Sequence, residues 1–160
     1  MENVLTTQQA ITITSKLRQQ GKKIVLAGGC FDLLHIGHIV FLENAKKTGD
    51  TLFVLLENDD TIKKLKGEKR PINTQEDRAK ILSSLNMVNY VILLPAQVTN
   101  DFYDKLVFQL KPAIIATTTG DSNRSHKERQ AKTIDAQVID VTMPVRDQST
   151  TKLLQLLEEL

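Results

Sequence analysis

Two histidines with a glycine between them follow the first apolar run of the chain. The segment reads Gly28-Gly-Cys-Phe-Asp-Leu-Leu-His-Ile-Gly-His38. Glycines allow a backbone to approach a ligand closely, and a helix that begins here would aim its free N–H groups at the same place. His35 and His38, three residues apart, would share one side of that helix. Two imidazoles, free amides and a helix dipole together favour the binding of phosphate oxygens.

Three other interpretations of this segment are open on the residues alone. A histidine pair at this spacing is more often structural than functional. Cys30, His35 and His38 could bind a metal ion, although one thiolate without a second cluster is an incomplete ligand set. A dinucleotide or P-loop site is the third, but neither the GxGxxG spacing nor a Walker loop is present. The position of the pair, in a glycine-led loop after an apolar run, favours the phosphate site.

Segments with the apolar spacing of strands alternate along the chain with segments that have the apolar spacing of helices. This alternation predicts an α/β fold that positions the loop. We expect strands at residues 23–27, 51–56, 90–94, 113–116 and 137–141. We expect helices at 11–20, 37–47, 59–65, after Thr74, at 101–110, at 126–134 and after Ser149 or Thr150. About five strands interleaved with helices predict a Rossmann-like, doubly wound parallel sheet with helices on both faces.

Ligands of such sheets bind beyond the carboxyl ends of the strands. The loops in which chemistry is expected therefore follow Ala27, Leu56, Leu94, Ala116 and Val141.

The first loop also resembles the signature of a known family, the cytidylyltransferase-like nucleotidyltransferases, which carry an H-x-G-H motif. The matching positions are Gly29, Phe31, Asp32, His35, Gly37 and His38. Segments 64–67, 70–73 and 77–78 resemble the nucleotidyltransferase domains of ADP-heptose synthases (heptose 1-phosphate adenylyltransferases). Residues 145–151 resemble a motif that these domains share with glycerol-3-phosphate cytidylyltransferases, so the similarity covers roughly residues 20–160.

The resemblance implies transfer of a nucleoside monophosphate from a nucleoside triphosphate to a sugar- or polyol-phosphate, with release of pyrophosphate. ATP is favoured over CTP, and Mg²⁺ is the implied cofactor, carried by the triphosphate rather than by the protein alone. Such a reaction depends on positioning and charge neutralisation. The alternatives are a nucleotide-binding regulatory domain without turnover, a cytidylyltransferase for glycerol 3-phosphate or another phosphorylated alcohol, and a metal-binding module that uses the histidines.

The residues implied to be catalytic are His35, His38 and Lys64. The implied nucleotide-binding residues are Gly28, Gly29, Cys30, Phe31, Asp32, Gly37, Asp121, Arg146, Ser149, Thr150 and Thr151. The basic segment 63–80 lies on the ligand side of the sheet. Arg70 and Arg78 are expected to bind the acceptor phosphate, because within this segment they fall in the stretches that match the family.

One stretch departs from the heptose enzymes, which carry Lys-Gly-Gly-Asp and an aromatic residue after the fourth strand. Here Gly120 and Asp121 match, whereas Thr118 and Ser122 replace the lysine and the aromatic residue. The change predicts another acceptor, another base or a weakened enzyme.

Length and composition set the outer limits of these expectations. A chain of 160 residues and 18.0 kDa predicts one domain, with an N-terminal helix (1–20) before an α/β core and C-terminal helix (21–160). A net charge of 21 − 19 = +2 is too small for a dedicated nucleic-acid binder. The single cysteine excludes a disulfide framework. The first ten residues lack the basic and apolar regions typical of a signal peptide, and no apolar run reaches the ~20 residues that span a bilayer. We therefore expect a cytoplasmic enzyme of carbohydrate metabolism with no membrane or nucleic-acid partner, and a homodimer is left open.

Overall fold

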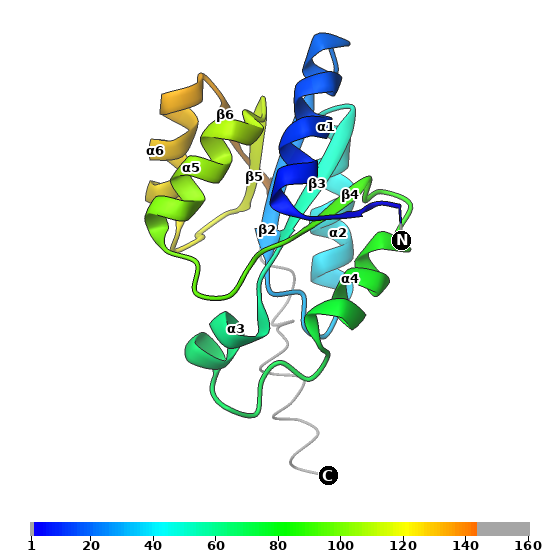
Figure 1. Ribbon diagram of the computed structural model, residues 1–160, viewed down its shortest axis with the longest axis vertical. Coiled ribbons are helices and arrows are strands. Elements are labelled where there is room, and N and C mark those ends of the chain that lie inside the picture. The colour runs from blue at the N-terminus through cyan, green and yellow to red at the C-terminus, as the bar shows by residue number, and fades with distance from the viewer. Residues whose placement is uncertain (1, 144–160) are drawn as a thin grey trace.

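Six parallel strands form one sheet in the order β1-β4-β3-β2-β5-β6 within residues 2–143, which are the residues that the structure, a computed structural model, describes (Figure 1). The strands are β1 (Val4–Leu5), β2 (Ile24–Gly29), β3 (Thr51–Leu56), β4 (Tyr90–Leu93), β5 (Ile114–Thr118) and β6 (Gln137–Thr142). The helices are α1 (Thr7–Gln19), α2 (Ile36–Lys47), α3 (Asp59–Lys66), α4 (Gln75–Ser83), α5 (Asn100–Leu110) and α6 (Arg124–Ile134). The predicted doubly wound α/β sheet is confirmed.

Helices cover both faces of the sheet, as Figure 1 shows. Both faces are apolar and need this cover, because successive side chains of each strand point to opposite faces. Val25 of β2 faces the core under α2 and α4, whereas Ile24 and Leu26 face the core under α1, α5 and α6. All six residues of β3 are buried, as expected for a central parallel strand with helices on both sides. The β2–β3 pair at the centre of the sheet is therefore a rigid support for the loops at its carboxyl end.

The N-terminus differs from the expected helix. Val4 and Leu5 form β1, which pairs with Val91 and Ile92 of β4. Thr6 caps α1 through a reciprocal capping box with Gln9, so the helix begins at Thr7 rather than at residue 11. A strand of two residues shows no periodicity, and the polar first turn of α1 hides its start. The helix expected after Ser149 or Thr150 lies outside the described residues.

The direction in which the chain adds strands to the sheet reverses at β2, the strand that leads into the first glycine loop. From β2 the chain proceeds to β3 and β4 on one side, and later to β5 and β6 on the other. The carboxyl ends of β2 and β5 therefore flank a switch point, which is where open α/β sheets bind their ligands. Among the described helices, none combines the length and apolar character that crossing a bilayer requires.

Candidate functional site

A cavity of about 740 Å³ opens at the carboxyl ends of β2, β3 and β5. The loop after β2 and the first turn of α2 form its centre, α3 and α5 border it on one side, and the loop after β5 and α6 border it on the other. A volume of this size suits a ligand as large as a nucleotide. Both histidines and Asp121 line the cavity. Five of the six predicted nucleotide-binding residues of the first loop and helix also line it, namely Gly28, Gly29, Cys30, Phe31 and Gly37.

The two histidines lie together at the N-terminus of α2. Their rings stack with centroids 3.9 Å apart, and the backbone N–H of His35 donates to His38 Nδ1 at 3.4 Å. Phe31, which is buried and has a positive φ of 45°, packs on His38 with ring centroids 5.2 Å apart. His35 Nδ1 is buried without a hydrogen-bond partner among residues 2–143. An unpaired imidazole nitrogen beside free helix amides is the environment expected of an anion site.

Both histidines are held in the neutral form. Burial lowers the pKa of His38 from 6.5 to about 4, and the neighbouring His35 adds to the effect. Burial also lowers the pKa of His35. At neutral pH each ring therefore offers one N–H donor without a net charge, and a bound anion would stabilise the protonated ring and raise both pKa values.

The depressed pKa of His38 predicts a pH dependence of stability. The unfolded chain binds a proton at this ring below about pH 6.5, whereas the folded chain does so near pH 4. The free energy of unfolding is therefore expected to fall as the pH drops from 6.5 to 4. Allowing for partial exposure of the ring, the loss is on the order of 1–2 kcal/mol. Urea unfolding of the wild type and His38→Gln across this range measures it, since the variant should lack this part of the pH dependence. Parallel curves for the two proteins would contradict the prediction.

The structure corrects two predicted roles, that of Asp32 in nucleotide binding and that of Arg70 in binding the acceptor phosphate. Asp32 is 2% exposed and does not line the cavity. Its carboxylate accepts from Arg70 Nε at 2.5 Å and from the backbone N–H groups of Ile72 and Asn73 at 2.8 and 3.1 Å. Both charged side chains are buried against each other, so they fasten the loop between α3 and α4 to the first loop instead of binding nucleotide or acceptor phosphate.

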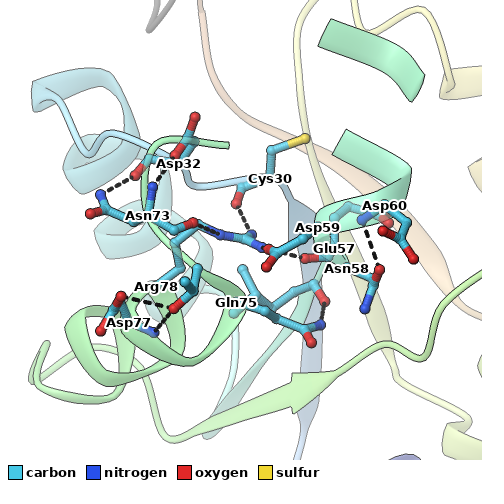
Figure 2. A network of polar contacts seen from close by, with 12 residues as sticks. Cys30, Asp32, Glu57, Asn58, Asp59, Asp60, Asn73, Gln75, Asp77 and Arg78 are labelled. Carbon is cyan, nitrogen blue, oxygen red and sulfur yellow. Dashed lines mark hydrogen bonds and ion pairs between the residues drawn. The ribbon is translucent and has the colours of Figure 1, made fainter. Parts of the chain in front are cut away.

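The predicted role of Arg78 is corrected as well, because its side chain is fully buried. Figure 2 shows the network of polar contacts that surrounds it. The guanidinium donates to the Cys30 carbonyl at 2.5 Å, the Glu57 carbonyl at 2.8 Å and the Asp59 carboxylate at 2.6 Å. Its Nε donates to the Asn73 carbonyl at 3.1 Å. The cation is therefore inaccessible to an acceptor phosphate, and it joins the loop after β2 to the loop after β3.

The remaining predicted residues are placed differently. Lys64 is exposed on α3 and does not line the cavity, to which that helix contributes Thr61 and Leu65. Its catalytic role stays a prediction. Arg146, Ser149, Thr150 and Thr151 lie outside the described residues.

The structure adds Lys127 of α6 to the cavity wall, from a helix to which the sequence predictions assign no site residue. Its Nζ lies 2.6 Å from Asp121 Oδ2 and 3.1 Å from Thr117 Oγ1. Burial opposes the ionisation of Asp121, but hydrogen bonds from Lys127, Thr117 and the Asn123 N–H outweigh it and lower the pKa. The signal available in the sequence is that Lys127 lies one turn into the helix after the ligand-side loop of β5.

Glu57 and Tyr103 are two further cavity residues that motif reasoning misses. The Tyr103 hydroxyl donates to Glu57 Oε1. Glu57 directly follows Leu56, whose loop is one of those predicted to hold chemistry, but a single carboxylate there matches no motif.

A metal centre built on Cys30 and the two histidines is not supported. Within residues 2–143, no group of three histidine, cysteine or carboxylate side chains is placed to hold a metal ion. Burial and the nearby Glu57 carboxylate raise the pKa of the Cys30 thiol, so this side chain stays protonated at neutral pH and is a poor ligand.

Comparison with known proteins identifies relatives for most of the chain. The family model described as cytidylyltransferase-like matches residues 26–155. The bifunctional protein HldE of Aliarcobacter butzleri is 42% identical over 113 residues, which are 71% of this chain and 23% of that protein. HldE of Wolinella succinogenes is 48% identical over 92 residues, which are 58% of this chain and 19% of that protein. The chain thus spans about a fifth of the length of these relatives.

Two solved structures resemble the fold. The lipopolysaccharide core biosynthesis protein from Thermoplasma volcanium has a TM-score of 0.63 at 28% identity, covering 80% of this chain and all of that one. A pantoate-β-alanine ligase from Francisella tularensis has a TM-score of 0.65 at 16% identity, covering 98% of this chain and 78% of that one. The second likeness concerns the fold alone.

Proposed function

Because the chain belongs to the cytidylyltransferase-like family, we propose that it transfers a nucleoside monophosphate from a nucleoside triphosphate to a phosphorylated sugar or polyol. ATP is the favoured donor, since the middle segments resemble heptose 1-phosphate adenylyltransferases. The observation that carries the proposal is the stacked pair of neutral histidines at the N-terminus of α2, inside a cavity at the switch point of the sheet. A cytoplasmic location and a homodimer remain expectations that accompany this proposal.

The proposed reaction forms one P–O bond and breaks another. An oxygen of the acceptor phosphate attacks the α-phosphorus of the triphosphate, and the bond to the leaving pyrophosphate breaks with its electron pair. Negative charge grows on the oxygens around the α-phosphorus, where imidazole N–H groups and the helix N-terminus are suited to stabilise it. The rest of the work is alignment of two anions, for which the glycine loop provides close backbone approach.

Magnesium is the proposed cofactor, and its chemistry is to neutralise the charge of the triphosphate. A magnesium ion at a nucleotide site usually keeps several waters and takes most of its other ligands from substrate phosphates, with one or two carboxylates. Within residues 2–143 no group of three potential ligands is placed to hold a metal. The cavity carboxylate of Asp121 already accepts from Lys127, Thr117 and the Asn123 N–H. We therefore propose that the triphosphate, and not a protein side chain, carries the ion.

The proposal is tested by pyrophosphate release. The protein is incubated with Mg²⁺, ATP or CTP, and a panel of acceptors that includes heptose 1-phosphate, mannose 1-phosphate and glycerol 3-phosphate. Pyrophosphate is expected only with one nucleotide and one acceptor class together, and is expected to disappear without Mg²⁺.

The second candidate function, a nucleotide-binding domain without turnover, predicts a different outcome of the same assay. It is favoured by Thr118 and Ser122, which stand where the heptose enzymes have a lysine and an aromatic residue. It predicts a thermal shift with ATP or CTP and no pyrophosphate with any acceptor. That pair of results would reject the transferase.

A further inference from the structure

One carboxylate oxygen of Glu57 in the cavity wall lacks a hydrogen-bond donor among the described residues. Glu57 lies directly after β3 and lines the cavity. Its Oε1 accepts from the Tyr103 hydroxyl, but its Oε2 is buried and has no hydrogen-bond partner among residues 2–143. A buried acceptor without a donor is unfavourable, and buried polar atoms in native proteins are nearly always paired. The atom therefore indicates a donor that arrives with a ligand.

The contacts around Glu57 determine which of its two carboxylate oxygens can accept a hydrogen bond from a ligand. Tyr103 reaches the carboxylate from α5, and burial together with Glu57 raises the pKa of its hydroxyl, which stays protonated and acts as a donor. Burial raises the pKa of Glu57, while the Tyr103 hydrogen bond and the charge of Arg78 act in the opposite direction. The Glu57 main chain is held as well, since its carbonyl accepts from Arg78 at 2.8 Å and its N–H donates to the Gly29 carbonyl at 3.2 Å. The carboxylate is thus oriented before any ligand binds, with Oε2 left free to accept.

Glu57 lies on a different side of the cavity from the residues that are expected to bind phosphate. The histidines lie after β2, and Asp121 and Lys127 lie on the β5 side of β2. Glu57 follows β3, on the other side of β2, where Thr61 and Tyr103 also line the cavity. A carboxylate repels phosphate groups, so its partner is a part of a ligand that carries neutral donors.

We propose that Glu57, oriented by Tyr103, binds hydroxyl groups on the carbon skeleton of the acceptor and thereby selects a polyhydroxylated substrate. This inference rests on the proposed transferase function. Vicinal hydroxyls also occur on the ribose of the nucleotide, so the experiment must separate these two sources. The β3 side of the cavity favours the acceptor, because the switch point between β2 and β5 is the expected place of the nucleotide.

The central variant is Glu57→Gln. It keeps an oxygen to accept the Tyr103 hydrogen bond and replaces Oε2 by an NH₂ group that donates instead of accepting. The matched control is Glu43→Gln, because Glu43 is exposed on α2 and does not line the cavity. Initial rates of pyrophosphate release give KM and kcat for the acceptor at saturating ATP, and calorimetry gives the affinities for ATP and 2′-deoxy-ATP.

We expect Glu57→Gln to raise the acceptor KM by about tenfold or more, since a hydrogen bond to a charged group is lost. Its kcat should stay within a few-fold of the wild type, its affinity for ATP should be unchanged, and Glu43→Gln should behave as the wild type. An unchanged acceptor KM would overturn the inference. So would a weakened affinity for ATP that is absent with 2′-deoxy-ATP, which would assign Glu57 to the ribose.

A failure of the proposed transferase function can be distinguished from a failure of the inference about Glu57. If the wild type releases no pyrophosphate with any acceptor, the proposed function is rejected, and the inference is decided by binding instead. Heptose 1-phosphate and glycerol 3-phosphate are then titrated into protein loaded with a non-hydrolysable ATP analogue. Weaker binding to Glu57→Gln than to Glu43→Gln supports the hydroxyl site, and equal binding, or none to the wild type, overturns it.

Discussion

Replacing His38 by alanine is expected to lower kcat for pyrophosphate release by about 10²–10³-fold, the loss typical of removing one donor to a developing oxyanion. The expectation follows from the placement of the ring, which stacks on His35, packs against Phe31 and lines the cavity. Burial lowers the pKa of the ring in the ligand-free protein, so the ring there offers an oriented N–H group, and a bound triphosphate would raise this pKa again. The measurement is kcat at saturating nucleotide and acceptor, with circular dichroism to confirm that the variant is folded.

The third histidine supplies a control for this prediction. His126 is exposed on α6 at the rim of the cavity, where its Nδ1 lies 3.5 Å from Arg129 Nη2. His126→Ala is expected to keep kcat within a few-fold of the wild type. If His38→Ala were folded and as active as His126→Ala, the histidine pair would have to be regarded as structural.

Replacing Arg78 by alanine is expected to lower the free energy of unfolding by about 3–5 kcal/mol, because a fully buried guanidinium loses three carbonyl acceptors as well as its ion pair with the partly exposed Asp59. The variant would leave the Asp59 carboxylate and the carbonyls of Cys30, Glu57 and Asn73 without their donor (Figure 2). Lysine provides one point of charge rather than a planar fork, so Arg78→Lys should recover part of the loss and not all of it. Urea unfolding at neutral pH measures each variant.

A matched control lies on the same helix. Lys80 is exposed on α4, and Lys80→Ala should change the free energy of unfolding by no more than about 0.5 kcal/mol. A loss of less than about 1 kcal/mol in Arg78→Ala would contradict the buried-network interpretation. It would reopen the earlier expectation that this guanidinium faces a ligand.

The parts of the site that were predictable depend on local spacing or on a general rule of sheet geometry. His35, Gly37 and His38 lie within one helical turn, so their shared direction follows from the helix period. The parallel sheet then brings the loops after β2, β3 and β5 to one edge, which predicted the place of the cavity.

The predictions that failed depend on contacts between distant segments. Arg78 contacts Cys30 across 48 positions of sequence, and Arg70 contacts Asp32 across 38. A basic residue in a basic segment has the same local pattern whether it faces a phosphate or enters the core. The sequence alone therefore could not show that these two arginines are buried. Glu57 was missed for a related reason, since its significance lies in an unpaired oxygen and a partner from α5.

The short first strand has a consequence for how the chain behaves in a crowded solution. Without β1, the apolar strand β4 would expose a row of unpaired backbone groups at the border of the sheet, ready to pair with another molecule. Val4 and Leu5 occupy that border, and the Asn3 carbonyl accepts from the Val91 N–H at 2.9 Å. A border strand of two residues offers little template of its own. The N-terminal segment thus protects the protein against edge-to-edge aggregation while adding nothing to the chemistry of the cavity.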